Sequence, residues 1–273
     1  MSPADLALLA AALIGAGVLS GLLAGIFGVG GGTVIVPVLY DVFRLMGVAE
    51  DVRMPLCVGT SLAIIIPTSI RSFRSHLAKG AVDMDVLRVW LAPVVGGVII
   101  GVVVAAHAPA WLFKAVFVLV AGILSVKLLF GRQNWVLGDT LPGKALMRAY
   151  GVVIGLTSAL IGIGGGAISN LLLSLYRRPI HQSVATSSGL GVIISIPAMI
   201  GYVIGGWSIT PQLPPFSLGY VSLIGAALII PTSMLAAPWG VRAAHALSQR
   251  RLEVAFGLYL LFVAARFFIS LLN

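Results

Sequence analysis

Long stretches without a single charged residue constrain this chain more than any other feature of its sequence. Residues 6–40, 54–70, 89–113, 149–176 and 179–241 contain no Asp, Glu, Lys or Arg, and two further apolar runs, 115–130 and 254–272, each enclose one cation. A helix needs about 20 apolar residues to cross a bilayer, and these runs lack the alternation of membrane strands. We therefore predict an all-α integral membrane protein.

Composition supports this prediction. Only 9% of the 273 residues are charged, whereas a soluble domain carries about 25%. The net charge of +9 comes from cations that are spread between the apolar runs. This pattern is typical of membrane-flanking charge and not of a basic nucleic-acid-binding face. The run 179–241 is long enough for two crossings, divided by the turn-rich residues 205–215.

The chain also repeats itself. The glycine cluster 28–32 recurs at 162–166, and the segment 58–61, which contains Thr60 and Ser61, recurs at 184–187 with Thr186 and Ser187. Residues 113–117 and 252–256 are also similar in sequence, although more weakly. We interpret the chain as two related halves, 1–134 and 135–273, within one transmembrane domain. Internal repeats of this kind are common among secondary transporters.

Each glycine cluster lies inside a charge-free stretch, 6–40 or 149–176. Each stretch is longer than one helical crossing needs and shorter than two crossings need. Each stretch is either one crossing broken by glycine or a re-entrant hairpin that leaves on the side it entered. Cytoplasmic loops are enriched in Lys and Arg. If both stretches cross, the 17 Lys and Arg residues are divided almost evenly between the two sides of the membrane. If both are hairpins, one side of the membrane holds all of them except Arg44, Arg53, Lys114 and Arg266. We therefore favour hairpins, each followed by three crossings, with the halves inverted and both termini outside.

The glycine clusters are also the strongest candidates for a binding site. Irregular backbone survives in a membrane only where it is buried in protein or lines a cavity. A helix that begins after such a turn presents free N–H groups and a positive dipole end to an anion. The alternative is close helix packing, because the glycines also fit the small-xxx-small pattern. We expect the site to include Gly28, Gly30, Gly31, Gly32 and Thr33 from the first cluster and Gly162, Gly164, Gly165 and Gly166 from the second.

Hydroxyl groups follow each cluster at the start of the next apolar run. Thr60 and Ser61 in the first half, and Thr186 and Ser187 in the second, could donate hydrogen bonds to an oxyanion. The alternative is that they bond to their own helix backbone. Asn170, one turn beyond the second cluster, is a further candidate.

The remaining polar residues argue against other chemistries. All eight acidic residues lie at or beyond the ends of the apolar runs, which disfavours a buried proton relay or cation site. The four histidines also lie near segment ends, and with one cysteine no metal-ligand spacing is present. We expect no catalytic residue, no metal and no cofactor, and we expect Lys127 and Arg266 to snorkel towards an interface.

Together these motifs resemble the TauE/SafE family of sulfite exporters. The resemblance rests on residues 25–32 with Pro37 following, on 58–62, on the second cluster 161–166, and on His181 with residues 185–187. The resemblance implies export of sulfite, a sulfonate or a related organic anion through a bacterial inner membrane.

We therefore expect a secondary transporter of a small oxyanion, bound between the two glycine breaks near the membrane midplane. Its partners would be the anion and the lipid bilayer, with no nucleic acid, and a homo-oligomer is left open. The alternative classes are a membrane-embedded enzyme acting on lipid or peptide and a scaffold protein. An enzyme would need a nucleophile and base, or a metal set, facing one cavity.

Overall fold

A computed structural model of the chain describes residues 3–27, 31–131, 135–246 and 249–272, and these are almost entirely helical. Eight helices within these ranges are long and apolar enough to cross a membrane, which confirms the prediction of an all-α protein with several candidate membrane spans. They are α1 (Pro3–Phe27), α3 (Glu50–Ala78), α4 (Met84–His107), α5 (Ala110–Phe130), α6 (Lys144–Ile161), α8 (Ile180–Gly205), α9 (Leu223–Ala246) and α10 (Gln249–Leu272). Two shorter helices, α2 (Gly32–Leu45) and α7 (Gly166–Ser174), follow the glycine clusters.

The run 179–241 does hold two crossings, α8 and α9. Between them lie a 3₁₀ helix, η1 (Trp207–Gln212), and two short antiparallel strands, β1 (Ser217–Leu218) and β2 (Val221–Ser222). The sequence fits this break, because Gly205 and Gly206 followed closely by Pro211, Pro214 and Pro215 together disfavour a regular helix. The prediction of a divided run is therefore confirmed.

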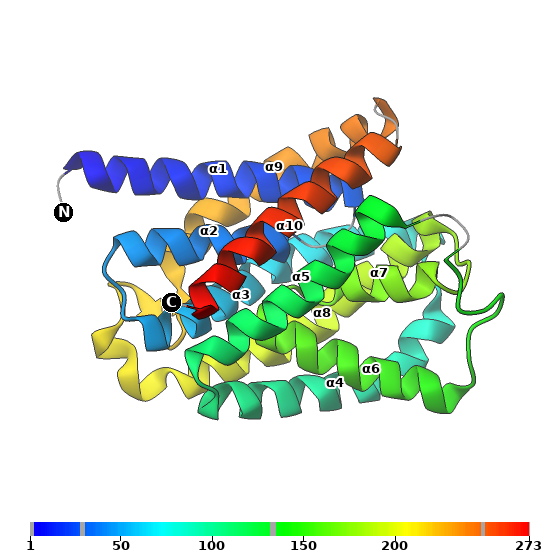
Figure 1. Cartoon of the computed structure of the whole chain (residues 1–273), viewed down its shortest axis with the longest axis horizontal. Helices are drawn as coiled ribbons and strands as arrows, with labels where there is room; N and C mark the ends of the chain where they lie inside the picture. The colour runs from blue at the N-terminus through cyan, green and yellow to red at the C-terminus, as the bar shows by residue number, and fades with distance from the viewer. Residues whose placement is uncertain (1–2, 28–30, 132–134, 247–248, 273) are drawn as a thin grey trace.

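The helices pack in pairs that join distant parts of the chain. Figure 1 shows α1 beside α9, α4 beside α6, and α10 beside α5. Glycine allows the closest approaches, since a Cβ on Gly21 of α1 would overlap the backbone of Ser233, and one on Gly155 of α6 would overlap that of Val94. Small residues permit this contact between membrane helices, where van der Waals packing replaces the hydrophobic effect.

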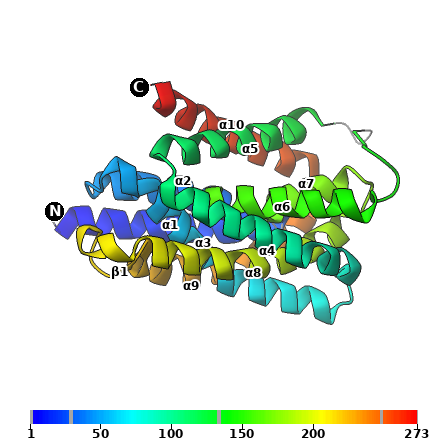
Figure 2. The same cartoon turned by 90° about the horizontal axis from the view of Figure 1, so that it is seen from below.

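Each glycine-rich stretch forms a helical hairpin. In Figures 1 and 2, α2 turns back along α1, and the two chain termini lie at the same end of the long axis. In the second stretch, the hydroxyl groups of Tyr150 and Tyr176 lie 3.0 Å apart. This contact places the residues after α7 beside the start of α6. The first arm of each hairpin is longer than a re-entrant arm requires, because α1 and α6 are themselves of membrane-spanning length.

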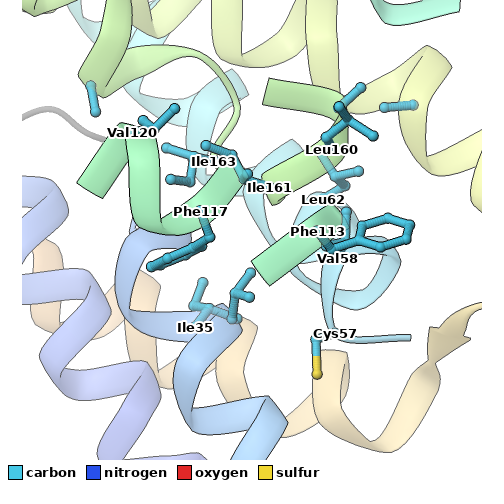
Figure 3. Packing of buried hydrophobic residues seen from close by; sticks show 14 of the residues in the cluster. Ile35, Cys57, Val58, Leu62, Phe113, Phe117, Val120, Leu160, Ile161 and Ile163 are labelled. Carbon is cyan, nitrogen blue, oxygen red and sulfur yellow. The ribbon is translucent and has the colours of Figure 1, made fainter. Parts of the chain in front are cut away.

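Helix α3 is the most buried of the eight spanning helices in the described part of the chain, and it contacts α8, α2 and α9. Figure 3 shows Val58 and Leu62 of α3 among Phe113, Phe117, Ile161 and Ile163, and all of these side chains are buried. Large apolar side chains such as Ile99, Val103, Leu119 and Phe262 are instead exposed on the outer faces. Exposed apolar surface of this extent fits lipid as the surrounding solvent.

Candidate functional site

Two short helices begin at glycine turns inside the bundle. Gly31, with φ of 72°, precedes α2, and Gly165, with φ of 77°, precedes α7. These left-handed conformations favour glycine, because a Cβ would strain the backbone. Gly165 also lacks room for a side chain, since a Cβ would overlap the side chain of Ile194. The local sequence therefore determines where both helices begin.

The two turns lie against each other. A Cβ on Gly32 would overlap the carbonyl oxygen of Gly162, and this oxygen accepts a hydrogen bond of 2.7 Å from Ser61 Oγ on α3. Gly164, with φ of 62°, packs against the side chain of Ile65. The structure thus brings both turns and Ser61 to one place. The predicted site residues Gly28 and Gly30 lie outside the described residues.

Thr60 and Thr186 accept hydrogen bonds from backbone groups of other helices. The N–H of Ser222 donates to Thr60 Oγ1, and the N–H of Asp83 donates to Thr186 Oγ1, each over 2.9 Å. Ser222 and Asp83 immediately precede α9 and α4. Both threonine hydroxyls therefore stabilise the start of a neighbouring helix. That either also contacts a substrate remains a prediction.

The other predicted polar residues have mixed surroundings. Ser187 Oγ donates to Val184 O over 2.9 Å, which is the helix-backbone alternative that the sequence left open. Asn170 is buried on α7, and Thr33 is buried on the first turn of α2. Thr33 and Asn170 therefore belong to the two helices that begin at the glycine turns, whereas Ser187 is held within α8.

Several buried hydroxyl groups near the glycine turns have no hydrogen-bond partner among the described residues. They are those of Ser20, Thr33, Ser158 and Ser195. Ser183 on α8 shares this property. A buried polar group left unsatisfied costs about 1–3 kcal/mol, so native proteins retain few of them.

Three of these hydroxyls lie beside the positive-φ glycines. A Cβ on Gly31 would overlap Ser20 Oγ. A Cβ on Gly165 would lie 3.4 Å from Ser158 Oγ, and one on Gly164 would lie 3.5 Å from Ser195 Oγ. Each turn therefore has next to it at least one hydroxyl that finds no partner within the described part of the chain. Ser20, Ser158 and Ser195 were not predicted from the sequence. Their spacing was a usable signal for two of them: Ser20 lies about two helical turns before Gly28, and Ser158 lies about one turn before Gly162.

The surroundings of the turns are apolar. Ile161 and Ile163 flank Gly162 in the chain. Figure 3 shows these two side chains in the same cluster as Val58 and Leu62, and the exposed fraction of each of the four is 1% or less. The stretches 54–70 and 149–176, which supply this region, contain no charged residue. Hydrogen bonds and backbone dipoles are stronger in such a low-dielectric environment. Any anion held here would therefore depend on neutral donors and helix N-termini.

The ionic contacts near α2 gather two acidic and two basic residues. Lys114 on α5 is buried and pairs with Glu50 at the start of α3, and its Nζ also donates to Ser270 Oγ over 3.0 Å. Arg266 on α10 donates to both carboxylate oxygens of Asp41 on α2, at 2.8 and 2.6 Å. Arg266 therefore does not snorkel freely, as the sequence suggested, but joins α10 to α2. Sequence position alone could not reveal either pairing.

Comparison with known proteins agrees with this architecture. The family model described as sulfite exporter TauE/SafE matches residues 13–267. A probable membrane transporter protein of Haemophilus influenzae is 31% identical over 259 residues, covering 93% of this chain and 96% of its own length. One from Methanocaldococcus jannaschii is 24% identical, covering 89% of each chain. No solved structure matches significantly.

The Bacillus subtilis protein YunE, also named a probable membrane transporter protein, is 24% identical over 213 residues, covering 71% of this chain and 78% of its own. The family match extends over nearly all of the described helices, including both glycine turns. This chain therefore belongs to the TauE/SafE family of membrane transporters, and it is not an enzyme.

Proposed function

We propose that this protein is a secondary transporter that exports a small oxyanion, namely sulfite, a sulfonate or a related organic anion. The substrate would bind between the two glycine turns, near the membrane midplane. The observation that carries the proposal is the set of buried, unpaired hydroxyls of Ser20, Thr33, Ser158 and Ser195 around these turns. An oxyanion with several acceptor oxygens would satisfy these donors together with the N-termini of α2 and α7.

We further propose that residues 1–134 and 135–273 are inverted halves. Helix packing supports this: α1 on α9 would correspond to α6 on α4, and α3 on α8 and α5 on α10 would each pair equivalent helices. The hydrogen bonds from Ser222 to Thr60 and from Asp83 to Thr186 would also be equivalent. The substrate would then lie where the halves meet, as in other transporters built from inverted repeats.

A site without cations suits release as well as binding. Neutral donors would hold an oxyanion less tightly than a buried Lys or Arg, so the anion could leave quickly. With a membrane potential that is negative inside, outward movement of one negative charge is favoured by about 2.3 kcal/mol per 100 mV. Export of a monovalent anion across a bacterial inner membrane would therefore need no coupling ion.

The test is anion binding followed by transport. Purified protein is heated with sulfite, methanesulfonate, sulfate, acetate or chloride, since a ligand of the folded state at about 100 times its Kd stabilises that state by about 2.7 kcal/mol. We expect stabilisation by sulfite or the sulfonate and little by chloride. Proteoliposomes loaded with the stabilising anion should then release it when the interior is negative. If no oxyanion stabilises the protein and none is released, the proposal is wrong.

A further inference from the structure

A second polar feature lies at the membrane end of the bundle where α4 and α6 begin. A cleft of about 410 Å³ opens there between the first turns of the two helices. Helix α4 contributes Arg88, Val89, Ala92 and Pro93, and α6 contributes Lys144 and Arg148. These residues lie within the first three turns of α4 and the first two turns of α6. Both helices are long and apolar enough to cross a membrane, so the cleft would lie near the lipid headgroups.

The cleft carries more positive charge than the protein neutralises. Arg88 pairs with Asp85 over 3.2 Å at an exposed position. Lys144 and Arg148 make no ion pair or hydrogen bond with any residue that the structure describes. Two exposed positive charges therefore line one cleft without a counter-charge among the described residues.

The placement of these cations on α6 is also unfavourable without a ligand. The N-terminus of a helix carries a partial positive charge, so Lys and Arg on the first turns are repelled by it. Helix α6 has no acidic residue in its first turn and no side-chain cap, because its N-cap residue is Gly143. An anion in the cleft would neutralise the two side chains and also face the free N–H groups of α6. The two side chains and the N-terminus of α6 thus all add positive potential at the same end of this helix.

The other wall of the cleft is apolar. Val89, Ala92 and Pro93 line it. Large apolar side chains on the same helices, including Leu91, Ile99 and Val153, are about half exposed on the outer face of the bundle. Trp90, which follows Val89 on α4, is fully buried, and its Nε1 donates to Met147 O over 2.8 Å. This hydrogen bond joins α4 to α6 next to the residues that line the cleft.

We propose that this cleft binds the headgroup of an anionic phospholipid. The phosphate would lie among Arg88, Lys144 and Arg148, and the upper part of an acyl chain would lie along Val89, Ala92 and Pro93. Basic pockets between membrane helices are suited to such headgroups. A soluble phosphate would satisfy the cations but would leave the apolar wall without a partner, and this difference favours the lipid. The bound lipid would join α4 to α6 at the end where both helices begin, beyond the glycines that let the two helices pack closely.

The experiment measures lipid binding to the full-length protein. The double variant Lys144→Gln/Arg148→Gln is compared with wild type in phosphatidylcholine nanodiscs with and without phosphatidylglycerol. The control is Arg71→Gln/Arg74→Gln, which removes two exposed cations from the end of α3 that precedes the start of α4. Native mass spectrometry reports bound phosphatidylglycerol, and the apparent Tm reports its effect on stability.

We expect phosphatidylglycerol to raise the Tm of wild type and of the control, and its affinity to fall about 30-fold in the double variant, since each basic residue near an anionic lipid contributes about a factor of five. The charge-conserving variant Lys144→Arg/Arg148→Lys should retain the effect, which separates charge from misfolding. Equal binding by the double variant and wild type would refute the proposal. So would an equal Tm increase with inorganic phosphate alone, because the ligand would then be a soluble anion.

Discussion

Replacing Ser158 by alanine should stabilise the empty protein and weaken its binding of an oxyanion. Ser158 Oγ is fully buried and has no hydrogen-bond partner among the described residues. Such a group costs about 1–3 kcal/mol, and alanine removes that cost while leaving most of the volume filled. For a protein of this size the apparent Tm should rise by about 2–4 °C for each kcal/mol recovered.

The effect on binding should have the opposite sign. A hydrogen bond from a neutral donor to a charged group contributes about 1.5–3 kcal/mol, so its loss should weaken the oxyanion affinity about 10- to 150-fold. Thermal unfolding without anion measures the change in stability. The shift of the Tm with increasing anion concentration measures the change in oxyanion affinity. Ser195→Ala should behave in the same way, because Ser195 Oγ is equally buried and unpaired.

Ser125→Ala is the matched control. Ser125 is also fully buried, but its Oγ donates to Gly122 O over 2.9 Å within α5. Its loss should lower the Tm slightly, by the equivalent of about 0.5–1.5 kcal/mol, and leave anion affinity unchanged. If Ser158→Ala instead lowers the Tm and binds the anion as wild type does, the Ser158 hydroxyl has a structural role and the proposed site is misplaced.

Three further predictions concern the turns and the topology. Thr60→Val should lower the apparent Tm by the equivalent of about 1–3 kcal/mol, because the buried N–H of Ser222 loses its acceptor; an unchanged Tm would show that this contact is dispensable. Gly165→Val should abolish transport in proteoliposomes, since φ of 77° and the nearby Ile194 side chain exclude a branched residue; wild-type transport rates would contradict this account. In a Cys57→Ser background, single cysteines at positions 80 and 250 should resist an impermeant thiol reagent in intact cells, and labelling of both from outside would refute the proposed inverted topology.

The membrane-spanning architecture could be predicted because it depends on local sequence. Charge-free runs of known length specify the crossings, and the prolines and glycines at 205–215 specify where one run divides. The glycine turns were also predictable, since their left-handed backbone strongly favours one residue type. What the sequence did not indicate was that α6 is of full spanning length, because a hairpin arm and a crossing have the same composition.

The partners of polar groups were much harder to predict. Thr60 bonds to Ser222, which lies in the other part of the chain, and Lys114 pairs with Glu50 across two helices. Such contacts depend on helix rotation and packing, which hydropathy does not specify. The unpaired hydroxyls were missed for the same reason. A serine in an apolar run has the same sequence signature whether it bonds to its own helix, as Ser187 does, or has no partner, as Ser158 does.

The packing of α1 on α9 has a consequence for biosynthesis. Gly17 and Gly21 on the first helix are covered by residues around 229–233, which a ribosome adds about 200 residues later. At about 5–20 residues per second, α1 must remain in the membrane for about 10–40 s before its partner emerges. During this interval its small-residue face is open to lipid or to an insertion chaperone. A chain truncated before α9 would leave that face permanently uncovered, so we expect membrane quality-control proteases to remove such fragments quickly.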